Sequence, residues 1–172
     1  MPALLPRLEE RFERVIVLPS SFDTSVPEVS EVLSRTQAMV FARERESYRQ
    51  ISKLCRASLA CDCSFFFGFS GYRRMGSGTL EAFRTDAESV HQRPPQGNRD
   101  ISLTCSSLDE WLWTIARHDE VRTDRAHVMI AAAMLGKRVF FRPSSYHKVP
   151  AIAEYSLRCL PVRPIDSVWS QE

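Results

Sequence analysis

Short apolar runs alternate with segments of helical character along the first third of the chain. Apolar runs at 15–18, 39–42 and 57–60 predict strands, and the first is continuous, which is typical of a strand buried on both faces. The segment 25–35 has a proline in its first turn, and 43–55 has apolar residues on one face, so both predict helices. This strand–helix order predicts a parallel sheet with helices on its faces.

The same alternation returns in the last part of the chain, after a segment at 63–99 that has no clear periodicity. Ser107 and Glu110 form a capping-box pattern, which predicts the start of a helix. The segment 128–135 is apolar nearly all round and is followed by Gly136, as expected for a helix buried in a core. Further strands are predicted at 80–83, near Val121 and at 138–141, and a last helix at 150–157. We therefore expect a single α/β domain over residues 1–172, with a parallel, Rossmann-like sheet and helices on both faces.

The start of the apolar helix has two side chains suited to an anion. Arg125 and His127 fall in its predicted first turn, where free N–H groups and the helix dipole attract negative charge. A phosphate or carboxylate would there meet a cation and a titratable proton donor. Two structural interpretations compete with this one. Asp124 can serve only as the N-cap of the helix, and His127 can be a hydrogen-bonded core histidine.

Other polar residues also follow predicted strands. Ser21, Arg43 and Asp62 come after the first three strands, and Lys148 lies in a polar segment after the strand at 138–141. Ligands of parallel α/β sheets bind at the carboxyl ends of the strands, so we expect these residues to converge with Arg125 on one edge. The alternative for Arg43 is a surface pair with a neighbouring glutamate, and for Lys148 a solvated loop.

Charge and cysteine content narrow the function classes. A net charge of +2 and a pI near 8.3 do not indicate the concentrated basic face of a nucleic-acid-binding protein. The five cysteines include no CxxC pair, and Cys61-Asp62-Cys63 has the wrong spacing for a usual zinc site. Residues 1–18 do not resemble a signal peptide, and no apolar run is long enough to span a membrane. We expect a cytoplasmic chain with reduced thiols and no bound metal.

Several motifs follow one another in a recognisable order. The most specific is Val121-Arg122-Thr123-Asp124-Arg125-Ala126-His127 with the apolar helix behind it. Weaker motifs are Val15 to Phe22, Phe41 to Tyr48, Cys61 to Phe65, Leu135 to Val139, and Tyr146-His147-Lys148. Together they resemble the polysaccharide pyruvyl transferase family, in register over roughly 15–157.

The resemblance implies a fold, an activity and a site. It implies a fold like the C-terminal half of a GT-B glycosyltransferase. The implied activity is transfer of pyruvate from phosphoenolpyruvate to two sugar hydroxyls of an exopolysaccharide or cell-surface glycan precursor, as a ketal. Phosphoenolpyruvate is the donor substrate, no cofactor is implied, and the acceptor is a glycan or a lipid-linked oligosaccharide. The family's RxH motif corresponds to Arg125 and His127, the expected catalytic pair. Arg43, Ser21 and Lys148 are expected to join them in binding the donor, in the cytoplasm or peripherally at the inner membrane.

The resemblance also raises alternatives. Members of the family usually have an additional N-terminal half with a glycine-rich turn, which we expect to be largely absent from this chain. A homo-oligomer or a complementing N-terminal half would then complete the cleft. The competing functions are a GT-B-like glycosyltransferase that uses a nucleotide-sugar, whose diphosphate would occupy the same helix start, and an inactive or partial anion-binding subunit.

Overall fold

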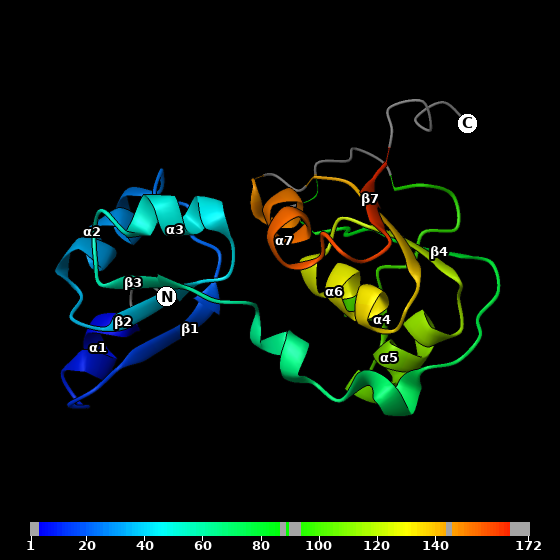
Figure 1. The fold of residues 1–172 in the computed structure, drawn as a ribbon, viewed down its shortest axis with the longest axis horizontal. Coiled ribbons are helices and arrows are strands. Elements are labelled where there is room, and N and C mark those ends of the chain that lie inside the picture. The colour runs from blue at the N-terminus through cyan, green and yellow to red at the C-terminus, as the bar shows by residue number, and fades with distance from the viewer. Residues whose placement is uncertain (1–3, 87–88, 90–93, 144–145, 166–172) are drawn as a thin grey trace. The chain divides into compact units, whose positions relative to one another are not determined.

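A computed structural model describes residues 4–86, 89, 94–143 and 146–165 and divides the chain into two compact units, Met1–Cys63 and Ser64–Glu172 (Figure 1). The expected α/β class with parallel strands is confirmed. Where the sequence suggested a single domain, however, each unit has its own parallel sheet and its own apolar core. The boundary lies where the chain forms two short 3-10 helices instead of a further strand, so the next strand begins a second sheet.

Unit 1 is a three-stranded sheet in the order β1-β2-β3. Its elements are α1 (Leu5–Glu9), β1 (Ile16–Ser20), α2 (Pro27–Arg35), β2 (Met39–Ala42), α3 (Arg45–Ile51) and β3 (Ala57–Leu59). Leu33 of α2 and Ile51 of α3 are fully buried against Val40 and Ala42 of the central strand. Figure 1 shows both helices on the same side of this sheet.

The prediction that the first strand is buried on both faces is wrong. Ile16 and Leu18 of β1 are 47% and 63% exposed, whereas the alternate residue Val17 packs against the unit 1 core. Successive side chains of a strand point to opposite faces of the sheet, and on β1 only the face that contains Val17 packs against the unit 1 core. Continuous apolar sequence therefore did not mean burial on both faces here.

Unit 2 is a four-stranded parallel sheet in the order β4-β5-β6-β7. Its elements are η1 (Cys63–Phe66, which begins at the boundary), η2 (Phe69–Tyr72), β4 (Thr79–Ala82), α4 (Ile101–Thr104), α5 (Leu108–Ala116), β5 (Glu120–Thr123), α6 (Ala126–Met134), β6 (Arg138–Phe141), α7 (Lys148–Ser156) and β7 (Val162–Pro164). Leu80, Val121 and Val139 point from adjacent strands into one core with α5, α6 and α7. Sequence reasoning did not predict β7 or the 3-10 helices.

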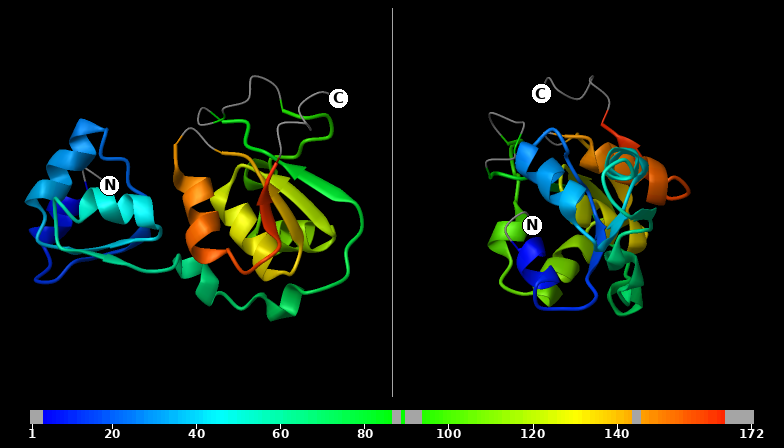
Figure 2. Two further views of the ribbon diagram at one scale, coloured as in Figure 1. Left: turned by 45° about the horizontal axis from the view of Figure 1, so that its top comes forward. Right: turned by 90° about the vertical axis from the view of Figure 1, so that its left-hand side faces the viewer.

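The buried helix predicted after residue 123 is α6. Seven of its nine residues are buried, and it packs against β5, β6, α5 and α7 (Figure 2). The chain leaves it through Gly136, whose φ of +78° is a conformation that glycine adopts without steric cost. The core therefore fixes the direction of α6, and with it the position of the residues at its N-terminus.

Helix α5 begins as the capping-box pattern predicted. The Ser107 hydroxyl accepts a hydrogen bond from the Glu110 backbone N–H at 3.1 Å. The Glu110 carboxylate reaches back one residue further than expected and accepts from the Ser106 N–H at 2.8 Å. These hydrogen bonds to Ser106 lower the pKa of Glu110 because they favour the ionised carboxylate.

Candidate functional site

The candidate site of unit 2 lies where β4 and β5 end, at the carboxyl edge of the sheet. Thr123, the last residue of β5, is fully buried. Its hydroxyl donates to the carbonyl of Ala82 at 2.8 Å and accepts from the Arg125 N–H at 3.0 Å. One side chain thus joins the end of β4 to the turn that enters α6, and the backbone of Arg125 is fixed in place.

Asp124 does not cap α6, so that prediction is wrong. The N-cap position is held by Arg125, and no side chain caps the helix there. Asp124 is fully buried, and its Oδ1 accepts from the backbone N–H of Arg84 at 2.8 Å. The carboxylate turns to the neighbouring strand exit because the Arg84 amide lies within reach there.

Arg125 is held by two carboxylates. One of its terminal nitrogens donates to Asp100 Oδ2 at 2.6 Å and to Asp86 Oδ2 at 3.0 Å. The side chain is 15% exposed, and its Nε is buried without a hydrogen-bond partner among the described residues. Sequence reasoning missed both aspartates because they lie in or just after the segment at 63–99, where no periodicity placed them.

Arg84 is the second arginine of this cluster. Its Nε donates to Asp86 Oδ1 at 2.7 Å and its terminal nitrogen to Asp86 Oδ2 at 3.0 Å, so the pair is bidentate. Asp100 is held separately, since it also accepts from the Thr85 N–H at 2.9 Å and the Thr85 hydroxyl at 3.3 Å. We refer to Arg84, Asp86, Asp100 and Arg125 as the arginine–aspartate cluster. No sequence motif indicated that Arg84 belongs to it.

His127 lies in the first turn of α6 and is exposed, so it is not a core histidine. Lys148 is the first residue of α7, and its ammonium lies 5.0 Å from the centroid of the Tyr146 ring, a cation–π contact. The role of either residue in binding or catalysis stays a prediction.

A second cluster forms at the carboxyl edge of the unit 1 sheet. Arg43 Nε donates to the Ser21 hydroxyl at 2.9 Å, and its NH1 donates to Asp62 Oδ2 at 2.7 Å. Arg43 and Asp62 are 12% and 7% exposed, which distinguishes this pair from a solvated surface ion pair. The neighbouring Glu44 carboxylate instead accepts from the Ser47 N–H at the start of α3.

The prediction that all of these residues converge on one sheet edge is wrong. Ser21, Arg43 and Asp62 meet in unit 1, and Arg125 meets its aspartates in unit 2. Because the strands form two sheets and not one, the two clusters do not share a sheet edge.

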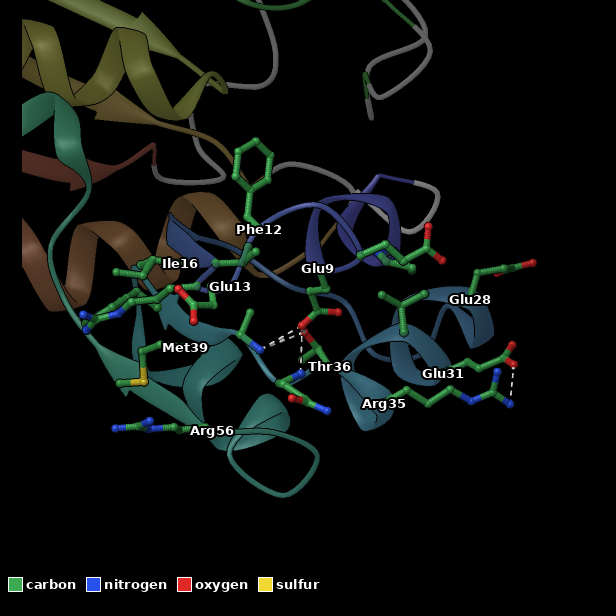
Figure 3. Close-up of a pocket in the computed structure, with 18 residues that line it drawn as sticks. Glu9, Phe12, Glu13, Ile16, Glu28, Glu31, Arg35, Thr36, Met39 and Arg56 are labelled. Carbon is green, nitrogen blue, oxygen red and sulfur yellow. Dashed lines mark hydrogen bonds and ion pairs between the residues drawn. The ribbon is translucent and has the colours of Figure 1, made fainter.

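A hollow with a volume of about 1130 Å³ lies in unit 1. It lies beside α1, α2 and the strands β1 and β2, and it contains none of the predicted site residues. Figure 3 shows Glu9 pointing toward the turn at Thr36, whose hydroxyl donates to that carboxylate at 2.6 Å. Five glutamates and three arginines line this hollow, so it has no excess of cations with which to hold a multiply charged anion.

A smaller pocket of about 300 Å³ lies on the face of the unit 2 sheet opposite its core. Arg122 bridges Glu81 at 3.1 Å and Glu120 at 2.9 Å across that face. Burial raises the pKa of Glu81, and the nearby Arg122 opposes that change. Arg142 lies over the Phe83 ring at 5.4 Å at the carboxyl end of the strands.

With this geometry in hand, comparisons with known proteins identify the family. The model of the polysaccharide pyruvyl transferases matches residues 4–146. The chain belongs to this family. The match includes both arginine clusters and His127 and ends before Lys148. It begins earlier and ends sooner than the span of 15–157 expected from the motifs.

A solved structure agrees with the fold of this pyruvyl transferase family member. It is a functionally uncharacterised protein of Klebsiella pneumoniae, 25% identical, with a TM-score of 0.79 over 96% of this chain and 68% of that chain. A search of curated proteins gave no match. Within the described residues, no helix is long and apolar enough to cross a membrane, and no group of three or more metal-binding side chains occurs.

Proposed function

We propose that this chain transfers pyruvate from phosphoenolpyruvate to two hydroxyls of an exopolysaccharide or cell-surface glycan precursor. The family supports transfer to polysaccharides in general. The observation that most favours the specific donor is the N-terminus of α6, where a half-buried arginine and an exposed histidine lie two residues apart and the N-cap residue makes no side-chain capping hydrogen bond. We place the reaction in the cytoplasm or at the inner face of the membrane.

The donor has two anionic groups, a carboxylate and a phosphate. Cationic side chains of this protein bind them. Arg125 and the α6 N-terminus hold one of them, because guanidinium N–H groups and helix amides suit carboxylate and phosphate oxygens. Lys148 is the further donor-binding residue proposed in unit 2. A donor-binding role for Arg43 and Ser21 stays a prediction from the sequence. No cofactor takes part in this scheme.

His127 supplies the proton in the proposed reaction. Protonation of the enol CH2 carbon makes it a methyl group and leaves an oxocarbenium-like centre at C2. One sugar hydroxyl adds to C2, the bond from C2 to the phosphate oxygen breaks, and the second hydroxyl adds to complete the ketal. Of the two hydroxyl protons, one restores His127 and the other leaves with phosphate. Arg125 stabilises the charge on the departing phosphate.

The reaction can be tested directly on the purified chain. Phosphoenolpyruvate is incubated with methyl hexopyranosides that have free hydroxyls at C4 and C6, and mass spectrometry follows the sugar while a colorimetric assay follows phosphate. We expect release of phosphate together with a sugar heavier by one pyruvate less one water.

Parallel reactions separate the competing functions. UDP-hexose in place of phosphoenolpyruvate should yield no transfer product. Glycosyl transfer from UDP-hexose would favour the nucleotide-sugar function. Donor binding without either product would favour an anion-binding subunit.

A further inference from the structure

The Asp86 carboxylate contacts the guanidinium groups of buried Arg84 and half-buried Arg125. Arg84 contacts both of its oxygens, at 2.7 and 3.0 Å, and Arg125 contacts Oδ2 at 3.0 Å. The two arginine side chains are only 8% and 15% exposed, whereas Asp86 is 35% exposed. The Asp86 carboxylate is thus more exposed than either of the two arginines that it joins.

The other carboxylate on Arg125 is bound differently. Asp100 is 4% exposed and is also held by the N–H and hydroxyl of Thr85. Asp100 is therefore the more buried of the two acids and is anchored by Thr85, whereas Asp86 lies nearer the solvent. Of the two acids, Asp100 orients Arg125, and Asp86 fills the outer side of both arginines.

Proteins also use arginine guanidinium groups in this way to hold the carboxylate or phosphate of a ligand. We infer that Arg84 is a further donor-binding residue, and that in the unliganded protein Asp86 occupies the place of an anionic group of the donor. This inference rests on the proposed function. The donor's anion displaces the Asp86 carboxylate, takes over its hydrogen bonds to Arg84 and Arg125, and leaves the Asp100 pair intact.

While Asp86 occupies the two arginines, the donor cannot bind them. The apparent affinity for the donor is therefore reduced to the fraction of molecules in which Asp86 does not contact the arginines. Removing its charge should therefore tighten binding. We expect Asp86→Asn to bind phosphoenolpyruvate about tenfold more tightly than the unchanged protein. Arg84→Lys, which cannot make the bidentate contact, should bind it about tenfold more weakly.

The experiment is calorimetric titration of the full chain and its variants with phosphoenolpyruvate, inorganic phosphate and pyruvate. Asp119→Asn is the matched control, because it removes the same charge from unit 2 at a 47% exposed aspartate that pairs with Arg138. Thermal melts establish that each variant is folded, and Asp86→Ser replaces Asp86→Asn if the latter does not fold. If Asp86→Asn binds only phosphate more tightly, Asp86 occupies the place of the donor's phosphate. If it binds only pyruvate more tightly, Asp86 occupies the place of the donor's carboxylate.

The outcomes separate this inference from the proposed function. If Asp86→Asn binds none of the three ligands more tightly than the unchanged protein does, the inference is overturned. If it binds phosphate or pyruvate more tightly, but no variant binds phosphoenolpyruvate, then Asp86 does cover an anion site at Arg84 and Arg125, but phosphoenolpyruvate is not its ligand and the proposed function fails. Tightening of the same size in Asp119→Asn would reduce the effect to net charge and would also overturn the inference.

Discussion

Replacement of His127 by glutamine will lower the rate of pyruvyl transfer about 10²–10⁴-fold, the usual contribution of a general acid. Glutamine keeps hydrogen-bonding capacity but cannot donate a proton to the enol carbon. His127 is exposed at the start of α6, so the fold should not change. The measurement is the turnover rate at saturating phosphoenolpyruvate, together with a binding titration, in which the affinity should change little.

His118→Gln is the control for this prediction. The His118 ring lies 2.8 Å from the Thr114 carbonyl, just after the C-terminus of α5 and before β5 begins, away from the carboxyl edge of the sheet. Its replacement should leave turnover unchanged. Equal turnover in His127→Gln and the unchanged protein would remove His127 from the chemical step.

Replacement of Arg125 by methionine will lower the free energy of unfolding of unit 2 by about 3–5 kcal/mol, because it leaves a buried charge without its partner. The Asp100 side chain is 4% exposed, and its Oδ2 accepts a hydrogen bond from Arg125 at 2.6 Å. Without Arg125, the negative charge of Asp100 would remain buried and out of reach of solvent. Trp111 and Trp113 lie on α5, and residues 1–63 contain no tryptophan. Urea denaturation followed by tryptophan fluorescence therefore reports this unit.

Two further variants test the cause of that loss. Arg138→Met removes an arginine that is 61% exposed and pairs with Asp119 and Glu120, and it should cost only about 0–1 kcal/mol. Adding Asp100→Asn to Arg125→Met should recover part of the stability, because the uncompensated charge is then absent. An Arg125→Met variant as stable as Arg138→Met would mean that the cluster contributes no stability.

The parts of the fold that sequence predicted are those set by local pattern. The apolar helix α6, the capped start of α5 and strand β6 each follow from residues within a few positions of one another. The same holds for the placement of Arg125 and His127 at a helix N-terminus. Parallel strands followed from the alternation of strands and helices.

The parts that sequence did not predict depend on contacts between distant residues. Asp86 and Asp100 reach Arg125 across 39 and 25 positions, and Asp124 reaches Arg84 across 40. Whether β1 was covered on both faces depended on which elements pack against the sheet, and the division into two sheets depended on strand pairing. The hydrophobic periodicity of a short segment carries no information about such contacts.

The most direct test of the central claim, that Arg125 at the start of α6 holds the donor, is calorimetric titration with phosphoenolpyruvate. Arg125→Lys keeps the charge that compensates Asp100 but loses the planar fork of the guanidinium. Arg138→Lys is its control at an exposed position of the same unit. We predict saturable binding to the unchanged protein and to Arg138→Lys, and binding weaker by about tenfold or more in Arg125→Lys. Equal binding in all three proteins would contradict the claim.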